Sequence, residues 1–168
     1  MNFEQAIEHV LSSEGGFTMD ADDPGNWTGG KKGKGILHGT KFGISAASYP
    51  GLNIKNLSRP EAIQIYKRDF WDKYKVDTLP SQIRLHFFDV CVNSGISRAV
   101  KILQRSLGVT ADGDFGPVTV KNLSKANVWK YARERSDFYI NHVKLYPVKQ
   151  KYLAGWIGRV LDVTENSF

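Results

Sequence analysis

The sequence predicts a mainly α protein with a short irregular or β region near its N-terminus. Apolar residues recur at helical spacing along most of the chain, and serine, asparagine, proline and glycine stand where helices should begin and end. Residues 17–50 differ, because they are rich in glycine and show little periodicity. With 41% hydrophobic and 24% charged residues and no apolar run near the roughly 20 residues of a membrane span, extended disorder and a membrane-spanning segment are both excluded.

The N-terminal half should hold two helices separated by the glycine-rich stretch. One apolar stripe predicts a helix over residues 3–13, closed by the glycine pair that follows it. Within 17–50, residues 41–44 are a candidate strand or turn. A capping-box pattern from Ser58 to Glu61 starts the second helix. Its expected buried face consists of Ala62, Ile65, Tyr66, Phe70 and Tyr74.

The C-terminal half should be helical throughout. Residues 81–94 are apolar on nearly every side, which is typical of a central core helix, and Gly95 should stop it. Capping and stop residues then delimit further helices, from Ser97 to Leu107, from Pro117 for a short distance, from Asn127 to about Tyr146, and over about 150–162. We expect residues 1–95 and 96–168 to be two functional segments packed as one compact unit, since no flexible linker separates them.

The charges are distributed unevenly along the chain. The first 30 residues contain six acidic residues and no lysine or arginine, whereas all 23 basic residues follow them, giving a formal net charge of +6. A basic surface favours a polyanionic partner, and by charge alone nucleic acid, an anionic membrane and the acidic polymers of a bacterial wall all qualify. No nucleic-acid recognition motif is present, so we expect no nucleic-acid partner.

Glu14 is the strongest candidate for chemistry. It stands at the end of the first expected helix, where a negative charge is locally unfavourable, and glycines that follow it allow close approach of a polymer. An Asp-rich loop containing Asp23 follows and can bring up a second carboxylate. Two carboxyl groups in different environments are what glycoside hydrolysis requires. The histidine spacing fits no zinc site and the single Cys91 forms no disulfide, so we expect no metal and no cofactor.

Several ordered motifs run along the chain: Glu14-Gly-Gly-Phe17, Asp23-Pro-Gly25, Thr40-Lys-Phe-Gly43-Ile44, Ala62 with Ile65-Tyr66 and Phe70-Trp71, Phe88-Asp89 with Asn93-Ser-Gly95, Leu103-Gln-Arg105 with Asp112-Gly-Asp-Phe-Gly-Pro117, Arg135 with Phe138-Tyr139, and Gly155-Trp156 with Arg159. In these motifs the chain resembles the glycoside hydrolase 108 family of bacterial and phage muramidases and the peptidoglycan-binding segment that accompanies it. The pattern departs from the family at Asn26, where glycine is usual, and in the segment from Trp27 to Gly39. The departure makes the geometry between Asp23 and Thr40 a point to test.

The resemblance implies a lysozyme-like helical fold, with the irregular or β region around the cleft, and an N-acetylmuramidase that cleaves the MurNAc-GlcNAc β-1,4 bond. Glu14 would be the general acid, and Asp23 or Thr40 would position water or stabilise the transition state. Substrate-binding candidates are Trp27, Gly43, Asp89 and Asn93. Asp89 and Asn93 stand four residues apart on one helix face, and two interpretations are open: they tie that helix to its neighbours, or Asn93 donates to an acetamido group.

The partners implied are the peptidoglycan glycan strand and an anionic wall or outer-membrane surface, with the protein acting as a monomer. We expect a phage endolysin, made in the host cytoplasm without a signal peptide and acting in the periplasm after release through a holin-type pore. A lytic transglycosylase acting on the same glycan and a non-catalytic wall-binding module are the alternatives, and a bacterial origin stays open.

Overall fold

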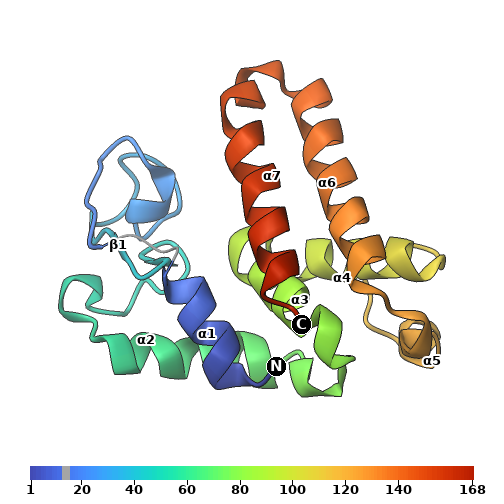
Figure 1. Ribbon diagram of the computed structural model, residues 1–168. Helices are drawn as coiled ribbons and strands as arrows, with labels where there is room; N and C mark the ends of the chain where they lie inside the picture. The colour runs from blue at the N-terminus through green and yellow to red at the C-terminus, as the bar shows by residue number, and fades with distance from the viewer. Residues whose placement is uncertain (13–15) are drawn as a thin grey trace. The chain divides into compact units, whose positions relative to one another are not determined.

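The protein, described from a computed structural model over residues 1–12 and 16–168, is mainly α-helical (Figure 1). The described part contains a single two-stranded sheet, so the predicted fold class is confirmed. Two compact units are distinguished, one formed by residues 7–69 and one by residues 1–6 together with 70–168. No helix in the described ranges is both long and apolar enough to cross a bilayer.

Helix α1 (Phe3–Ser12) confirms the first predicted helix, whose last residue falls outside the described part of the chain. Its start is capped reciprocally. The backbone N–H of Gln5 donates to Oδ1 of Asn2, and the N–H of Asn2 donates to Oε1 of Gln5, both at 3.0 Å. This pair satisfies N–H groups that a helix start leaves without intrahelical partners.

Strands β1 (Thr40–Lys41) and β2 (Ile44–Ser45) form a hairpin in the unit 7–69. Phe42 and Gly43 are left as a two-residue loop, with φ angles of 54° and 75°. Positive φ at both loop positions is what a type I′ hairpin turn requires. The hydroxyl of Tyr66 donates to the Phe42 carbonyl oxygen at 2.8 Å and fixes the turn. Both parts of the prediction for residues 41–44, strand and turn, are therefore present.

Helix α2 (Arg59–Tyr66) begins at the predicted capping box. The N–H of Ser58 donates to Oε2 of Glu61 at 2.8 Å, and the N–H of Glu61 donates back to Oγ of Ser58 at 3.4 Å. Hydrogen bonds from the Ser58 hydroxyl and backbone also lower the pKa of the Glu61 carboxyl. A carboxylate in the first turn further suits the positive end of the helix dipole.

The π-helical stretch Lys67–Asp72 follows α2 directly and shifts the buried face. Phe70 and Tyr74, predicted to be buried, are partly exposed, whereas Trp71 is fully buried. A π-turn accommodates one residue more than an α-turn, so the helical period that holds in α2 cannot be extended through it. The indole N–H of Trp71 donates to Oδ2 of Asp77 at 2.9 Å, which satisfies its one polar group.

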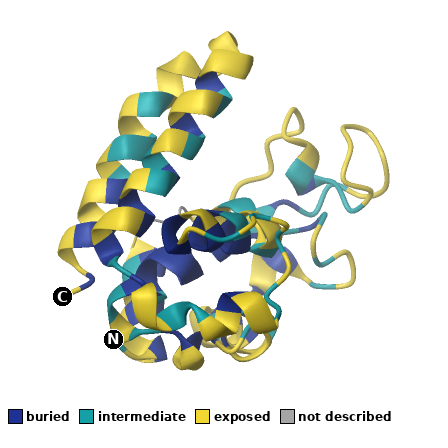
Figure 2. Ribbon diagram, turned by 90° about the vertical axis from the view of Figure 1, so that its right-hand side faces the viewer, coloured by how far each residue is buried: buried dark blue, intermediate teal, exposed yellow. Residues whose placement is uncertain are grey.

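The unit formed by residues 1–6 and 70–168 is built around helix α3, which is mostly buried (Figure 2). Figure 1 shows α6 and α7 lying side by side, joined by a short turn. The helices of this unit are α3 (Ser81–Ser94), α4 (Ile96–Leu107), α5 (Pro117–Lys121), α6 (Val128–Leu145) and α7 (Gln150–Glu165). The predicted core helix is thus confirmed with both of its boundaries.

One predicted cap is wrong. Helix α4 begins at Ile96, separated from the end of α3 by Gly95 alone, and Ser97 lies inside its first turn. Gly95 makes this tight junction possible because it adopts φ 83°, a conformation that other residues rarely tolerate. The predicted segment boundary at residue 95 falls inside this unit, where α3 packs against α4, α6 and α7. The division into two functional segments stays a prediction.

Candidate functional site

Asp23 caps a short 3₁₀ turn in the unit 7–69. Its Oδ1 accepts a hydrogen bond from the N–H of Gly25 at 2.8 Å, and the turn Pro24–Asn26 follows. The side chain is exposed. The aspartate therefore has a defined backbone position on a surface loop, with its carboxylate accessible to water.

Thr40, the other candidate partner for Glu14, is tied to the same loop by Asn26. The Thr40 hydroxyl donates to Oδ1 of Asn26 at 2.7 Å, and Nδ2 of Asn26 donates to the Asp20 carbonyl oxygen at 2.9 Å. The backbone N–H of Asn26 donates to the Asp23 carbonyl oxygen at 3.1 Å. Asn26 is fully buried, and one side chain thus joins the Asp23 loop to strand β1. The departure from glycine at this position is what provides the link.

Backbone contacts complete the frame around Thr40. Its N–H and C=O exchange hydrogen bonds of 2.9 Å with Thr18, and its other edge pairs with Ser45. The Asn26 carbonyl oxygen also accepts from the N–H groups of His38 and Gly39, both at 3.0 Å. Thr40 is therefore held by rigid backbone pairing as well as by its hydroxyl.

The remaining candidates of this unit lie on the same framework. The indole N–H of Trp27 donates to the Ala21 carbonyl oxygen at 2.9 Å, so its ring rather than its N–H is available for stacking. Gly43 is the exposed second residue of the hairpin loop. Glu14 lies outside the described residues. A pocket of about 430 Å³ opens beside this framework and includes Met19, His38 and Lys55 in its lining.

Asp89, on α3, has a different environment from the other candidates. Its carboxylate is fully buried and forms ion pairs with Arg135, which is fully buried on α6, and with Arg159 on α7, whose Nη2 lies 2.6 Å from Oδ1. Burial alone would raise the pKa of Asp89, but the charge of Arg135 and the hydrogen bonds and charge of Arg159 outweigh it, so the pKa is lowered. Asp89 thus holds three helices together and reaches a ligand only through Arg159.

Asn93, one turn later on α3, donates through Nδ2 to the carbonyl oxygen of Asp89 at 2.7 Å and to its Oδ1 at 3.2 Å. A backbone carbonyl only accepts, so the amide nitrogen must face it. The group that Asn93 offers to a ligand is therefore its oxygen, Oδ1. The predicted donation from Asn93 to an acetamido group stays a prediction, and its Nδ2 is engaged by Asp89 in this structure.

His86 and Arg135 had no sequence signal that set them apart as partners. Nδ1 of His86 lies 3.4 Å from Nη1 of Arg135, and Nε2 lies 3.0 Å from Oγ1 of Thr164. The Thr164 hydroxyl in turn donates to the Val160 carbonyl oxygen. Because an arginine only donates, His86 accepts at Nδ1 and donates at Nε2. These contacts extend the buried network of Asp89 across α3, α6 and α7.

Two protein-family models match this chain. The family model described as "Glycosyl hydrolase 108" matches residues 7–95, and the model described as "Predicted Peptidoglycan domain" matches residues 98–161. The first match alone covers more than half of the chain. The chain belongs to the glycosyl hydrolase 108 family. It is a glycoside hydrolase that acts on peptidoglycan, as the second match also supports.

A solved structure is similar to this family member over nearly its full length. The structure of Brucella abortus SagA shares 29% sequence identity with a TM-score of 0.75, and the similarity covers 98% of this chain and 92% of that chain. Curated proteins provide no match. The match to residues 7–95 includes Glu14, Asp23, Thr40, Asp89 and Asn93, so every predicted site residue lies in the glycosyl hydrolase part of this family member.

The described residues of this glycosyl hydrolase contain no group of three or more histidine, cysteine, aspartate or glutamate side chains arranged to hold a metal ion. The turn Asp112-Gly-Asp superficially resembles a calcium loop. Its Asp112 carboxylate accepts a hydrogen bond at Oδ1 from Nε2 of Gln104, at 2.6 Å. Cys91 is buried, and burial raises the pKa of its thiol well above the ordinary value. The Asp112 turn is therefore tied to helix α4 through Gln104, and the Cys91 thiol lies inside the core helix α3.

Replacing Asn26 with alanine should reduce both stability and activity. The substitution frees the Thr40 hydroxyl and leaves the Asp20 carbonyl oxygen without its Nδ2 donor, and we expect a loss of about 1–3 kcal/mol in the free energy of unfolding. Chemical denaturation and wall-clearing rates measure the two effects. Asn166→Ala is the control, because Asn166 is exposed and bonds only within its own helix end. Equal effects of the two substitutions would contradict the linking role of Asn26.

Proposed function

We propose that this glycosyl hydrolase is an N-acetylmuramidase that cleaves the MurNAc-GlcNAc β-1,4 bond with Glu14 as general acid. The observation that carries the proposal is the hydrogen-bonded link through Asn26, which joins the two candidate partner groups, Asp23 and Thr40, in one framework. The family membership and the position of Glu14 ahead of this framework support the same assignment.

In the proposed reaction, Glu14 donates its proton to the glycosidic oxygen as the C1–O bond breaks. Water then adds to C1 and releases one proton as it becomes the new hydroxyl group, which replaces the proton lost from Glu14. Thr40 suits the role of orienting that water. Its hydroxyl proton is engaged by Asn26, so the oxygen presents lone pairs to a water hydrogen. Asp23 suits the role of stabilising the positive charge that develops on the sugar, because its carboxylate is fixed by the Gly25 N–H and faces solvent.

Clearing of a wall suspension distinguishes an enzyme that cleaves peptidoglycan from a module that only binds it. We expect the full chain to clear purified peptidoglycan at a protein amount far below that needed to coat it, because each molecule turns over many bonds. Binding to the pelleted wall without clearing would favour the binding module instead.

In this proposal the enzyme acts in the periplasm as a phage endolysin released through a holin-type pore.

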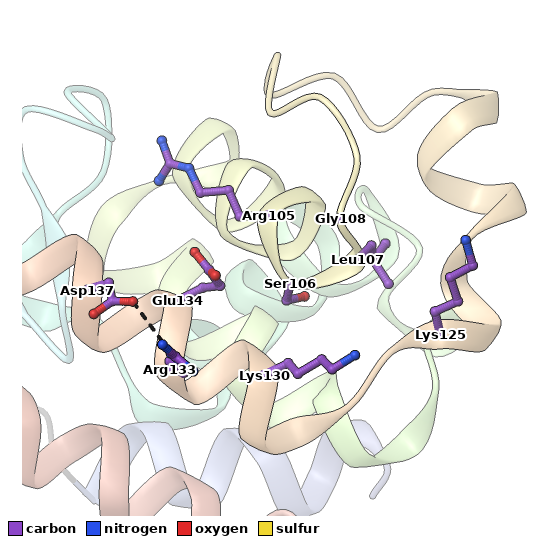
Figure 3. A pocket seen from close by; sticks show the side chains of 9 residues that line it. All are labelled: Arg105, Ser106, Leu107, Gly108, Lys125, Lys130, Arg133, Glu134 and Asp137. Atoms are coloured by element: carbon purple, nitrogen blue, oxygen red, sulfur yellow. Dashed lines mark ion pairs between the residues drawn. The ribbon is translucent and has the colours of Figure 1, made fainter.

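We propose further that a basic pocket between α4 and α6 holds the enzyme on anionic wall or outer-membrane phosphates. The pocket, of about 450 Å³, is shown in Figure 3. Its charged lining consists of Arg105, Lys125, Lys130 and Arg133 together with Glu134 and Asp137. Arg133 forms an exposed ion pair with Asp137 at 4.0 Å, and the basic side chains outnumber the acids. A cluster of this kind attracts phosphates in a salt-dependent way.

Replacing Lys125 and Lys130 together with glutamine should weaken wall binding about tenfold or more at low salt, since each basic residue near an anionic surface contributes on the order of 1 kcal/mol. Co-sedimentation with walls over a salt series measures it, and we expect a shallower salt dependence for the variant. Lys73→Gln is the single-charge control, because Lys73 is exposed and lies outside this pocket. Unchanged salt dependence in the double variant would contradict the proposal.

A further inference from the structure

A second pocket in the unit of residues 70–168 combines positive charge with aromatic surface. It has a volume of about 340 Å³ and is lined by residues from the end of α3, the start of α4, and α6 and α7. The residues that concern its chemistry are Asn93, Arg98, Phe138, Tyr139, Trp156 and Arg159. No role in the proposed cleavage reaction has been assigned to Arg98, Phe138, Tyr139, Trp156 or Arg159.

The charges of this pocket select an anion. Arg98 and Arg159 line it, and its described lining contains no aspartate or glutamate. Behind the wall, the carboxylate of Asp89 forms ion pairs with both Arg135 and Arg159. The Arg159 side chain is 22% exposed and is held in place by hydrogen bonds from Nε and Nη2 to Asp89. A guanidinium in a fixed position pairs with a carboxylate more strongly than a mobile one does.

The aromatic side chains form a continuous wall. The ring of Trp156 stacks on Tyr139, with ring centroids 5.2 Å apart and an interplanar angle of 27°, and also on Tyr152 at 5.8 Å. The guanidinium of Arg98 lies over the ring of Phe138, with its central carbon 4.6 Å from the centroid. Apolar groups of a ligand can pack against the parts of Phe138, Tyr139 and Trp156 that line the pocket while its charge meets the arginines.

Asn93 adds a third kind of contact. Its amide nitrogen donates to Asp89, which leaves Oδ1 as the acceptor that it offers to a ligand. The pocket therefore matches a ligand that has a carboxylate, an adjacent amide N–H and a small apolar side chain. These are the features of a peptide chain that ends in a carboxylate.

We propose that this pocket binds the carboxylate-terminated peptide stem of peptidoglycan. Arg98 and Arg159 take the carboxylate, Asn93 accepts the neighbouring amide N–H, and Trp156 packs against the side chain of the terminal residue. The inference rests on peptidoglycan being the substrate and adds a site that recognises its peptide part. Such a site would hold the enzyme on cross-link-free stems of the wall that it degrades.

Titration with soluble muropeptides tests the site by NMR in the full chain. The reporter is the indole N–H of Trp156, assigned by its disappearance in Trp156→Phe. We expect a saturable shift with an N-acetylmuramyl tetrapeptide whose terminal carboxylate is free. The same compound with its carboxylates amidated should bind at least about tenfold more weakly, and a GlcNAc trisaccharide without peptide should not move the signal.

Arg98→Gln should weaken muropeptide binding about tenfold, because it removes one charge-assisted contact from an exposed residue that contributes little to the core. Arg68→Gln is the matched control, since it removes the same charge from an exposed arginine that is not part of the lining of any pocket described above. Equal affinity for the free and amidated compounds, an unchanged affinity in Arg98→Gln, or inorganic phosphate shifting the signal at the same concentration would each overturn the proposal. Since the experiment measures binding alone, it tests this site even if the protein does not cleave the glycan as proposed.

Discussion

Asp89→Asn should destabilise the helical unit by about 3–5 kcal/mol, because it leaves the fully buried Arg135 without its counter-charge. In a chain of this size such a loss corresponds to a fall of roughly 10 °C in the melting temperature. Chemical and thermal denaturation followed by circular dichroism measure it. Asparagine keeps the shape of the side chain, so the effect reports on charge rather than on packing.

Asp137→Asn is the control for this substitution. Asp137 forms an ion pair with Arg133, but the two side chains are 53% and 84% exposed, and exposed pairs contribute little. We expect a change below about 1 kcal/mol. An effect of Asp89→Asn no larger than that of Asp137→Asn would contradict the proposed structural role of Asp89.

The lowered pKa of Asp89 also sets the direction of a pH effect. A carboxyl whose pKa is lower in the folded than in the unfolded state adds stability at pH values above its unfolded value of about 3.9. That contribution is lost as the pH falls through the lower folded value. Acid titration of stability should therefore be less steep in Asp89→Asn than in the wild type below about pH 4.

Glu14→Gln should lower the rate of glycan cleavage by about 10²–10⁴-fold, because glutamine has nearly the same shape but no acidic proton to donate. Wall binding should be unchanged, since the substitution leaves intact the described residues that line the pocket between α4 and α6 and the pocket of Arg98 and Trp156. The rate of release of soluble fragments from purified peptidoglycan and co-sedimentation with the same material measure the two quantities.

Glu4→Gln is the matched control for the Glu14 variant. Glu4 is exposed in the first turn of α1 and carries the same change of charge and shape. We expect it to retain wild-type activity. Residual activity of Glu14→Gln within a few-fold of the wild type would contradict the assignment of Glu14 as the general acid, whatever the result for Glu4→Gln.

Local sequence patterns predicted much of the fold because those patterns have local causes. The capping box at Ser58, the glycine stop after α3 and the asparagine cap before α6 each depend on residues within one turn of the helix end. The hairpin at residues 40–45 is similar, since its turn needs two residues at positive φ and Gly43 is one of them. Such features can be recognised without knowing what packs against them.

The features that escaped prediction depend on contacts between distant residues. The π-helical stretch that buries Trp71 instead of Phe70 has no short motif, and its position follows from packing in the helical core. The partners of Asp89 stand 46 and 70 positions away along the chain, so its pairing with Arg135 and Arg159 had no sequence signal. Periodicity indicates that a buried acid needs partners, but it does not say which ones.

The sequence identified Asp23 and Thr40 as candidate site residues, but it did not predict the hydrogen bonds through Asn26 that join them. Asp23 and Thr40 were singled out by their motifs, whereas Asn26 was noticed only because glycine is usual there. The structure shows that its side chain bridges the loop and the strand. A deviation from a motif was thus the signal for a positioning residue.

Mass spectrometry of the fragments that wild type and Glu14→Gln release from purified peptidoglycan tests the central claim most directly. We expect the wild type to give muropeptides with a reducing muramic acid end, because water adds to C1, and the variant to give almost none while binding the wall normally. Anhydro-muramic ends from the wild type would instead identify a lytic transglycosylase. The same reducing products from Glu14→Gln at a comparable rate would contradict catalysis by Glu14.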